Sequence, residues 1–510
     1  MAIDVDLRKR VPMRQMPPDQ AVTTFDEHVA TYTPEEAMAE ARRALEAGFD
    51  LEAAHQGCPF KVDIPTYLHK VAEGEFDAAR AIIDDAHPFP AIFGRMCHWF
   101  CERNTPALLD VGVRDPEWHP PEWRLAPEPD AIIARAPQTR GESAQQLARG
   151  GPVDERGIQK PNLLALERFV GDYGDPDRAP LKPRRPPSGA RVAVIGGGSG
   201  GLGAAWMLRR LGHDVDVYDS LPVPGGMLWQ GYPPFRMAKF GVRRDNDPTH
   251  WGARYIGGRF ISKAEIARIV DEYDYTFLAI GARKARRLSI PGEDAEGVWS
   301  GLDFITEVSF GQPPAVGRRA LVLGAGSTAH DAARTARRLD CEVKIVYRRA
   351  VDQMPVGERN PEMYVRSMAR EGIEYVFLSN PLRILTDDRN RVTGVEFQRM
   401  ELGEVDASGR SSVHAIPGAT YVVACELVLV AVGEEVDLGN LPDGIAHNGV
   451  EVIVDRADHR TSHPRVFAGG DLIGDKGNDG AALAGIQAAY TIDSLIRGEP
   501  IVRFDSRPLR

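Results

Sequence analysis

Hydrophobic and polar residues follow a helical period in two stretches near the start of the chain. Residues 33–48 (TPEEAMAEARRALEAG) and 63–86 (DIPTYLHKVAEGEFDAARAIIDDA) repeat apolar side chains at intervals of three and four, which is the spacing of an amphipathic helix. Residues 102–157, by contrast, are rich in proline, glycine and charge and show little periodicity, which predicts a long irregular excursion. We therefore expect a mostly helical N-terminal region that carries this excursion.

A different pattern covers residues 192–219 (VAVIGGGSGGLGAAWMLRRLGHDVDVYD), where an apolar strand leads into a glycine-rich turn, a helix and a second strand. In such a unit Gly196 permits the tight turn, Gly198 lets the backbone approach a pyrophosphate, and Gly201 allows close packing of the helix. The helix N-terminus offers amide donors to the phosphates, and Asp219 can accept a hydrogen bond from a ribose hydroxyl. The complete context predicts a dinucleotide-binding fold.

The same pattern returns at residues 319–349 (RALVLGAGSTAHDAARTARRLDCEVKIVYRR). Its turn is the GxGxxA variant, formed by Gly324, Gly326 and Ala329. The second strand ends in Arg348 and Arg349 instead of an acid, and guanidinium groups can bind a 2′-phosphate, so this copy is typical of NADP(H) binding. The alternative is that both arginines only decorate the end of a strand. Two such folds indicate two dinucleotides, FAD in the first and NADPH in the second.

Composition and charge narrow the class of protein. The chain has 510 residues and a formal net charge of −11 without a long basic run, which argues against nucleic acid and anionic membranes as partners. No segment approaches about 18 consecutive apolar residues, and the start of the chain lacks the hydrophobic run of a signal peptide, so a soluble cytoplasmic protein is expected. The length allows about three domains, and a proline-rich break near residue 187 precedes the first dinucleotide fold.

The five cysteines are too few for a disulfide framework in a chain of this length. Disulfide reductases with the same double fold place a redox CxxC pair beside the flavin, but here Cys341 and Cys425 are isolated in apparent strands and are predicted to be buried core thiols. The other three, Cys58, Cys97 and Cys101, lie in the N-terminal region. Without a redox disulfide, another group must receive the electrons.

Seven motifs occur together with characteristic order and spacing: IGGGSGG, PGGMLWQGYPPFRM, TFLAIGARKARRLSIPGEDAEGVWSGLDF, LGAGSTAHDAARTARRL, VYRRAVDQMP, LVLVAVG and VFAGGDLIG. Over about residues 40–500 the chain thereby resembles the small (beta) subunit of NADPH-dependent glutamate synthase and the N-terminal half of dihydropyrimidine dehydrogenase. The resemblance implies an α/β protein in which a mostly helical Fe–S domain precedes two Rossmann-like domains of the glutathione reductase type. The implied domains are residues 1–186 (Fe–S), 187–300 with 440–510 (FAD, discontinuous) and 301–439 (NADPH).

The resemblance also implies contacts to FAD. Gly470 and Asp471 would lie near the ribityl chain and the pyrophosphate, and the helix that follows would direct its N-terminus at the isoalloxazine. At the start of that helix Asn478 and Asp479 stand where the family more often has small residues and threonine. The remaining family positions line the FAD site or mark the crossing between the two dinucleotide domains. They are Gly225, Gly226 and Arg236 for the FAD site, and Gly281 and Gly433 for the crossing.

The N-terminal cysteines match only part of the family's set for two [4Fe-4S] clusters. Cys58, Cys97 and Cys101 correspond to three ligands of one cluster, whereas the positions missing here, occupied by residues such as Ala44, belong to the other. In dihydropyrimidine dehydrogenase a glutamine from a helix just before the FAD domain completes the retained cluster, and the matching residue here is Glu167. The resemblance thus implies one [4Fe-4S] cluster.

Two alternatives for the N-terminal cysteines stay open from the sequence. They are either vestigial core residues, or ligands of a structural zinc together with His55 or His98. His98 replaces the proline that the family usually has at that position, which keeps the zinc interpretation in view.

These patterns and the resemblance together predict an electron-entry subunit. Electrons would pass from NADPH to FAD, then through one [4Fe-4S] cluster to a partner subunit or a ferredoxin-like acceptor. No side chain is assigned a catalytic role, and neither nucleic acid nor membrane is expected as a partner. The competing hypothesis is an N-terminal docking module that holds no metal or holds zinc, with the flavin reducing a diffusible acceptor directly.

Overall fold

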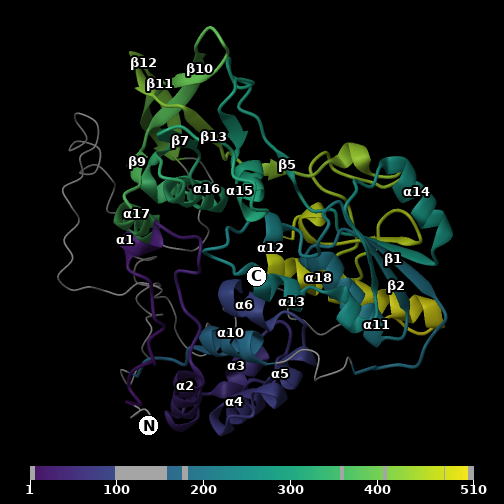
Figure 1. Ribbon diagram of the computed structural model, residues 1–510. Coiled ribbons are helices and arrows are strands. Elements are labelled where there is room, and N and C mark those ends of the chain that lie inside the picture. Colours follow the sequence, from purple (N-terminus) through teal and green to yellow (C-terminus); the bar gives the residue numbers. More distant parts are fainter. Residues whose placement is uncertain are drawn as a thin grey trace.

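Helices dominate the N-terminal region, as the periodicity predicted. The computed structural model describes residues 6–97, 101, 158–174, 182–355, 361–405, 411–475 and 477–502, so the expected excursion at 102–157 lies outside the described residues. The N-terminal helices are α1 Pro18–Ala21, α2 Pro34–Glu46, α3 Leu51–Gly57, α4 Ile64–Glu73, α5 Phe76–Asp84, α6 Pro90–Met96 and α10 Leu163–Tyr173. Helices α2 to α6 and α10 form the lower lobe of the molecule in Figure 1, whereas α1 lies above this lobe.

Local chemistry sets the ends of these helices. Thr33 and Glu36 form a capping box at the start of α2, because the Thr33 side chain accepts from the Glu36 N–H while Glu36 accepts from the Thr33 N–H. Helix α4 ends at Gly74, whose φ of 81° lies in the left-handed region that favours glycine.

The first dinucleotide fold is a five-stranded parallel sheet with the order β15-β4-β1-β2-β3. Its strands are β1 Arg191–Ile195, β2 Asp214–Tyr218, β3 Arg254–Ile256, β4 Tyr275–Leu278 and β15 Val466–Ala468. Its helical elements are α11 Ser199–Arg210, α12 Met227–Gln230, α13 Lys239–Asp245, η2 Pro248–Trp251, α14 Lys263–Glu272, η4 Leu438–Asn440, η5 Gly470–Ile473 and α18 Asn478–Arg497. The chain therefore leaves this sheet after β4 and returns to it only at β15, which makes the domain discontinuous.

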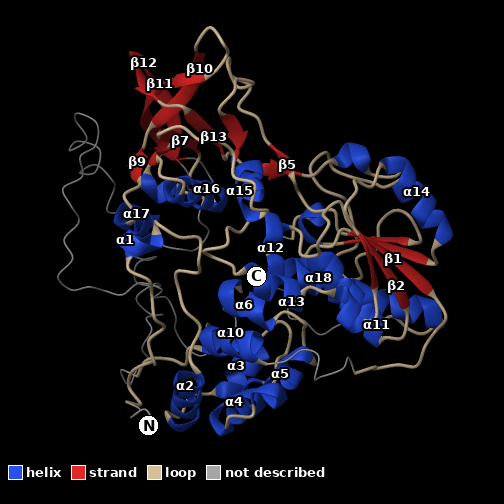
Figure 2. Ribbon diagram, in the orientation of Figure 1, coloured by secondary structure: helices blue, strands red, loops and turns tan. Residues whose placement is uncertain are grey.

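The second dinucleotide fold repeats the arrangement with the order β6-β13-β7-β8-β9, again all parallel. Its strands are β6 Val298–Ser300, β7 Arg319–Leu323, β8 Glu342–Val346, β9 Glu374–Val376 and β13 Leu427–Val430. Its helical elements are α15 Gly301–Ser309, α16 Ser327–Arg338, η3 Val351–Gln353 and α17 Pro361–Arg370. An antiparallel sheet is inserted between β9 and β13 and stands at the top of Figure 2, formed by β10 Ser379–Thr386, β11 Val392–Val405 and β12 Ser411–Ala424.

A short antiparallel ribbon marks the crossing between the two folds. It pairs β5 Lys284–Ala285 with β14 Glu434–Glu435. Because β6 pairs with β13, residues 298–300 belong to the second sheet, whereas the predicted boundary of the first domain was residue 300. The two sheets and the helical N-terminal region together confirm the predicted fold class.

The N-terminal helices share one hydrophobic core with the first dinucleotide fold, because buried residues of both belong to a single contiguous cluster. Within this region α6 and α10 cross in close contact. A Cβ atom at Gly94 would lie 2.2 Å from the Arg168 backbone nitrogen, and one at Gly171 would lie 2.1 Å from that of Ala91. Only glycine allows the two helices to approach so closely. This packing fixes the orientation of α6 and thereby the position of Cys97, which follows it.

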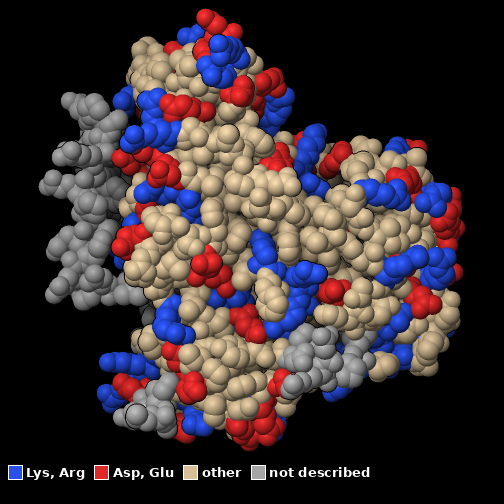
Figure 3. Space-filling view, viewed as in Figure 1, with Lys and Arg blue, Asp and Glu red and all other residues tan. Residues whose placement is uncertain are grey.

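Charges of both signs are interspersed on the face shown in Figure 3, without a broad single-sign field. Among the described helices, none is long and apolar enough to cross a membrane.

Candidate cofactor sites

The first glycine-rich turn has the geometry that a dinucleotide needs. Gly196 adopts a φ of +109°, and a Cβ atom there would lie 2.1 Å from the Ala279 carbonyl oxygen. Gly201 is equally tight, since its Cβ would lie 1.8 Å from the Gly196 oxygen. Gly198 is different, because its Cβ would meet only Gly226 Cα, at 3.9 Å. Two glycines thus shape the turn, and the third leaves open space where a pyrophosphate can approach.

Asp219 follows β2 and faces this turn. Its carboxylate accepts from the Gly197 N–H and, at 2.7 Å, from the Leu221 N–H. Burial raises the pKa of this carboxyl, and the backbone donors oppose the shift. The side chain is placed where a ribose hydroxyl could donate to it.

The PGGM loop packs directly on the glycine-rich turn. The Gly225 N–H donates to the Gly197 oxygen at 2.8 Å, and Gly226 has a φ of +52° with only 2.7 Å between its hypothetical Cβ and Gly198 Cα. Both glycines are therefore required for the loop to cover the turn. Gly225 and Gly226 therefore lie against the first glycine-rich turn.

Arg236 reaches the second dinucleotide fold. Its guanidinium forms an ion pair with Asp331, the fifth residue of α16, with 2.5 Å between Nη1 and Oδ2. It also lies over the Tyr232 ring, 5.2 Å from the centroid. The side chain that the family pattern assigns to FAD thus joins the two dinucleotide folds.

The segment before α18 closes the first site from the other side. Gly470, with a φ of +69°, opens the 3₁₀ turn η5, in which Asp471 is half-buried. The first turn of α18 then lies beside the glycine-rich turn, because Ser199 Oγ donates to Asn478 Oδ1 at 2.9 Å. Asn478 Nδ2 in turn donates to the Tyr232 hydroxyl at 3.2 Å.

The second glycine-rich turn repeats the geometry of the first. Gly324 has a φ of +127°, and its Cβ would lie 2.1 Å from the Ala431 oxygen, just as Gly196 meets Ala279. Gly326 precedes α16 and has open space, with Pro355 Cγ 3.8 Å from its Cβ position, while Ala329 is fully buried. The two glycine-rich turns therefore have equivalent backbone geometry.

The two arginines after β8 lie at the carboxyl edge of the second sheet. Arg348 is exposed, and Arg349 is half-buried with a buried Nε that has no hydrogen-bond partner. A buried guanidinium nitrogen without an acceptor is costly and is satisfied by an incoming anion such as a phosphate.

The glycines expected at the crossing precede its two strands. Gly281 has a φ of +68° and Gly433 a φ of +114°, and the Arg286 N–H donates to the Gly433 oxygen at 2.9 Å. Both backbones adopt conformations that favour glycine, so the chain can turn sharply as it passes between the two sheets.

In the N-terminal lobe Cys58 ends α3 and is buried. Lys61 adopts a left-handed φ of 57° in the tight turn that follows, and its N–H donates to the Cys58 carbonyl oxygen at 3.1 Å. Burial raises the pKa of the Cys58 thiol to about 11, and the nearby backbone groups of residues 60–62 oppose this shift.

Glu167 faces the same region from α10. Its Oε1 is buried, has no hydrogen-bond partner and lies 3.4 Å from His87 Nε2. The Phe89 N–H donates to His87 Nδ1 at 3.2 Å, so Nε2 carries the proton in the neutral ring. Among the contacts described for this buried carboxylate oxygen, the His87 Nε2–H is therefore the nearest polar group.

Cys97 and Cys101 are buried in the same core as Cys58. The described residues contain no group of three or more His, Cys, Asp or Glu side chains that converges on a single metal ion. A cubane distributes its protein ligands over four iron atoms, so it does not need such convergence. The three buried free thiols are ligands of the kind that such a cluster uses.

The zinc interpretation receives less support from the described residues. His55 Nδ1 donates to the Val62 oxygen at 2.7 Å, which leaves one ring nitrogen for a ligand, and His98 lies outside the described residues. Ala44, at one of the missing cysteine positions, is fully buried in the apolar core. Packing thus fills a position that a second cluster would use.

Cys341 and Cys425 are fully buried, as predicted. Each lies just outside a strand and not within one, since β8 begins at Glu342 and β12 ends at Ala424. Burial raises the pKa of the Cys341 thiol to about 11, so it stays protonated at neutral pH.

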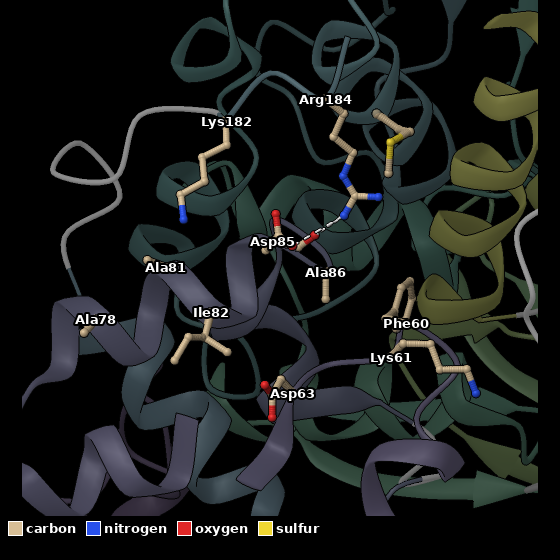
Figure 4. A pocket seen from close by; sticks show the side chains of 11 residues that line it. Phe60, Lys61, Asp63, Ala78, Ala81, Ile82, Asp85, Ala86, Lys182 and Arg184 are labelled. Carbon is tan, nitrogen blue, oxygen red and sulfur yellow. Dashed lines mark hydrogen bonds and ion pairs between the residues drawn. The ribbon is translucent and has the colours of Figure 1, made fainter. Parts of the chain in front are cut away.

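A pocket of about 630 Å³ opens beside the Cys58 turn (Figure 4). Phe60 and Lys61 form part of its wall, and Arg184 on the opposite side pairs with Asp85, 3.5 Å away. Its wall thus includes residues of the turn that follows Cys58.

Neither the ion pair between Asp331 and Arg236 nor the contact that Asp479 makes was predicted from the sequence. Asp479 is buried in the first turn of α18 and accepts a hydrogen bond from Cys97 Sγ across 3.8 Å. The only sequence signal was the departure from the family pattern at Asn478 and Asp479, which identified the position but gave no partner.

Comparison with known proteins agrees with this geometry. Residues 190–491 match the pyridine nucleotide-disulphide oxidoreductase family, and residues 21–107 match dihydropyrimidine dehydrogenase domain II, 4Fe-4S cluster. The chain is 31% identical over 398 residues to the NADPH-Fe(3+) oxidoreductase subunit beta of Geobacter sulfurreducens, covering 76% of this chain and 52% of that protein. It thus spans about half the length of that relative.

Two further relatives match over nearly their full length. The glutamate synthase [NADPH] small chain of Azospirillum brasilense is 29% identical, covering 92% of this chain and 90% of that protein. The small chain of Escherichia coli K12 is 27% identical, covering 92% and 93%. The chain belongs to the pyridine nucleotide-disulphide oxidoreductase family, its N-terminal region matches a 4Fe-4S domain, and it is similar to glutamate synthase small chains.

Proposed function

We propose that this protein oxidises NADPH at FAD and delivers electrons one at a time through a single [4Fe-4S] cluster to a partner subunit or protein. When bound, the flavin accepts two electrons as hydride and releases them singly, and the cluster carries one electron at a time. The chain's own residues bind and orient these groups.

Each dinucleotide has a cradle of its own. The open positions at Gly198 and Gly326 let backbone amides reach the pyrophosphates of FAD and NADPH, respectively. Arg348 and Arg349 bind the 2′-phosphate of NADPH, and Asp219 binds a ribose hydroxyl of FAD. The assignment rests on the equivalent backbone geometry of the two turns and on the buried, unpartnered Nε of Arg349.

Cys58, Cys97, Cys101 and Glu167 are the proposed ligands of the cluster. The observation that carries this assignment is the burial of all three thiols in one hydrophobic core, which continues into the first dinucleotide fold. Cysteine thiolates are the ligands that iron–sulfur clusters use.

Delivery to a partner is supported by two observations. Relatives of this chain are named as subunits, including the Geobacter protein and the glutamate synthase small chains. The pocket of Figure 4 brings the molecular surface to Phe60 and Lys61, directly beside the Cys58 turn, so a partner can approach the cluster from this side.

Anaerobic purification followed by rapid mixing with NADPH tests the proposal. We expect about four irons and four sulfides per chain, loss of the flavin absorbance first, and then an EPR signal of a reduced cluster. Protein that holds FAD but no iron would instead favour the metal-free docking module, and zinc in place of iron would favour a site with His55 or His98. Purification of the native complex would identify the partner.

A further inference from the structure

The N-terminal segment forms a strap, residues 14–31, outside the helices of the lower lobe. Its two arms lie antiparallel, because Gln15 pairs with Val29 in a β-bridge and the Met16 N–H donates to the His28 oxygen at 2.7 Å. In Figure 1 these arms are the purple traces that rise from the lower lobe to α1. The second arm, residues 25–31, contacts both the lobe and the first dinucleotide fold.

The helical lobe anchors this second arm. Glu27 pairs with Arg95 of α6, with 2.6 Å between Oε1 and Nε. Arg168 of α10 donates to the Val29 oxygen at 2.6 Å. Because α6 and α10 pack tightly against each other, the arm has a rigid base.

The second arm holds loop 233–238 of the first dinucleotide fold. The Phe235 oxygen accepts from the His28 N–H at 3.2 Å and from His28 Nδ1 at 2.7 Å. The Ala238 N–H donates to Glu27 Oε1 at 3.0 Å, and the rings of Phe25 and Phe235 lie 6.3 Å apart between centroids. The arm therefore contacts Phe235 at both its backbone and its ring.

The ring of Phe235 also meets helix α16 of the second dinucleotide fold. It is fully buried, and Cζ of Arg338 and of Arg334 lie 3.9 Å and 4.9 Å from its centroid. Glu371, which follows α17, orients both guanidiniums, at 2.7 Å from Arg338 Nη1 and 2.8 Å from Arg334 Nε. Cation–π contacts strengthen when they are shielded from water. One aromatic ring thus joins a loop of the first fold to a helix of the second.

The same loop is linked to the first glycine-rich turn. Tyr232 directly precedes it, and the Tyr232 hydroxyl accepts from Asn478 Nδ2 at 3.2 Å. Asn478 in turn accepts from Ser199 Oγ at the start of α11. Helix α16, which the ring of Phe235 contacts, begins directly after Gly326 of the second glycine-rich turn. The loop therefore connects elements that border both proposed dinucleotide sites.

We propose that His28 and Phe235 are positioning residues for electron transfer from NADPH to FAD. The strap holds Phe235 against α16 and thereby fixes the second fold relative to the flavin site. This inference rests on the proposed function, in which NADPH is oxidised to NADP⁺ and its hydride passes to FAD. Such a transfer requires the reacting atoms to lie about 3–3.5 Å apart, and a misplacement of about 1 Å can slow it about 100-fold.

The test compares His28→Leu with His28→Asn in the anaerobically purified full chain. Leucine removes the Nδ1 donor to the Phe235 oxygen, whereas the amide nitrogen of asparagine can replace it. In stopped-flow mixing with NADPH, the limiting rate of flavin reduction should fall at least about tenfold in His28→Leu and stay within about threefold of wild type in His28→Asn. The apparent Kd for NADPH and the FAD content should stay within about twofold of wild type in both variants.

Phe235→Leu tests the contact with α16. Leucine preserves most of the buried volume but removes the ring on which both guanidiniums lie, so the limiting rate should fall as it does in His28→Leu. Reduction of the flavin by dithionite should be unchanged in all variants, since a small diffusing reductant needs no alignment of the two folds. His463→Leu is the matched control, because His463 Nδ1 accepts from the Arg465 N–H at 3.2 Å within its own loop, and it should leave the limiting rate unchanged.

Several results would overturn the inference. One is a limiting rate within about twofold of wild type in His28→Leu, and another is a weaker Kd for NADPH at an unchanged limiting rate, since the strap would then act on binding. Equal slowing in His28→Asn and His28→Leu would show that the hydrogen bond to Phe235 is not the cause. Loss of FAD from His28→Leu would make the residue part of the flavin site.

The pair of His28 variants decides the question if Phe235→Leu does not fold. A wild-type protein that holds no FAD, or whose flavin is not reduced by NADPH, would instead contradict the proposed function itself. The two failures are therefore distinguishable.

Discussion

Arg236 Nη1 lies 2.5 Å from Asp331 Oδ2, and this ion pair joins the first dinucleotide fold to helix α16 of the second. The Asp331 side chain is 5% exposed and that of Arg236 is 27% exposed. The nearby Asp331 carboxylate raises the pKa of the Arg236 guanidinium against the effect of burial. The relative placement of the two folds thus depends in part on one charged contact.

Breaking this pair should loosen the junction of the two folds. A double-mutant cycle with Arg236→Gln and Asp331→Asn should give a coupling free energy of at least about 1 kcal/mol, because the residues contact one another directly. Thermal unfolding of the four proteins measures it. If Arg236→Gln alone released FAD while Asp331→Asn retained it, Arg236 would act through the cofactor and not through the ion pair.

Coenzyme preference should depend on the arginines after β8. Replacing Arg348 and Arg349 with alanine should lower kcat/KM for NADPH at least about tenfold and spare NADH, because each charge-assisted hydrogen bond contributes roughly 1.5–3 kcal/mol. Arg318→Ala is the matched control, since this side chain is 82% exposed and lies ahead of β7, at the opposite edge of the sheet. A wild type equally fast with NADH would contradict the assignment.

Replacing Gly198 or Gly326 with valine should show which dinucleotide binds at each glycine-rich turn. Gly198 and Gly326 have negative φ values near −80° and free space at Cβ, so Gly198→Val and Gly326→Val should fold. Gly198→Val should purify nearly free of FAD, because the side chain occupies the place of the pyrophosphate. Gly326→Val should keep FAD but slow its reduction by NADPH about 100-fold. Loss of FAD from Gly326→Val would reverse the assignment of the sites.

The cluster ligands should be separable from the structural cysteines by iron analysis. Cys58→Ser should lose most of the iron and retain FAD and flavin reduction by NADPH. Cys341→Ser and Cys425→Ser are controls, since both thiols are buried in the second fold and should leave the iron content unchanged. Glu167→Ala should shift the EPR signal of the cluster or speed its decay, since a harder oxygen ligand is lost. An unaltered cluster would exclude Glu167 as a ligand.

Acid should destabilise the second dinucleotide fold through His330. Burial lowers the pKa of this imidazole from 6.5 to about 4, and both ring nitrogens are buried without a hydrogen-bond partner. Between these two values the unfolded chain binds a proton that the native state does not. Stability is therefore complete above about pH 6.5 and falls as the pH drops toward 4, by up to roughly 3 kcal/mol.

His330→Phe should reduce this pH dependence while preserving the stacking on Tyr364, which lies 4.7 Å away between ring centroids. The variant should still show part of the effect, because burial also lowers the pKa of His28 to about 4. Thermal unfolding between pH 4 and 7 measures the slope. An equal slope in wild type and His330→Phe would show that His330 does not contribute.

The sequence alone determined the elements and the two dinucleotide turns. Apolar runs such as Val192–Ile195 must form buried parallel strands, and glycines at positions like Gly196 and Gly324 are the residues that tolerate the turn that follows. These properties are local, because hydrophobic period and backbone freedom act within a few residues of the chain. The helical N-terminal region followed from the same rule.

Only the tertiary structure decided which charged and thiol groups meet. The contacts of Cys97 with Asp479, of Arg236 with Asp331 and of Glu167 with His87 join separate elements, and nothing in the spacing of these residues specifies them. Helices α6, α10, α11 and α18 approach through glycine and alanine positions, and this packing fixes the side-chain neighbours. Sequence patterns therefore identified the cradles, whereas the connection between them depends on how the packed helices are oriented.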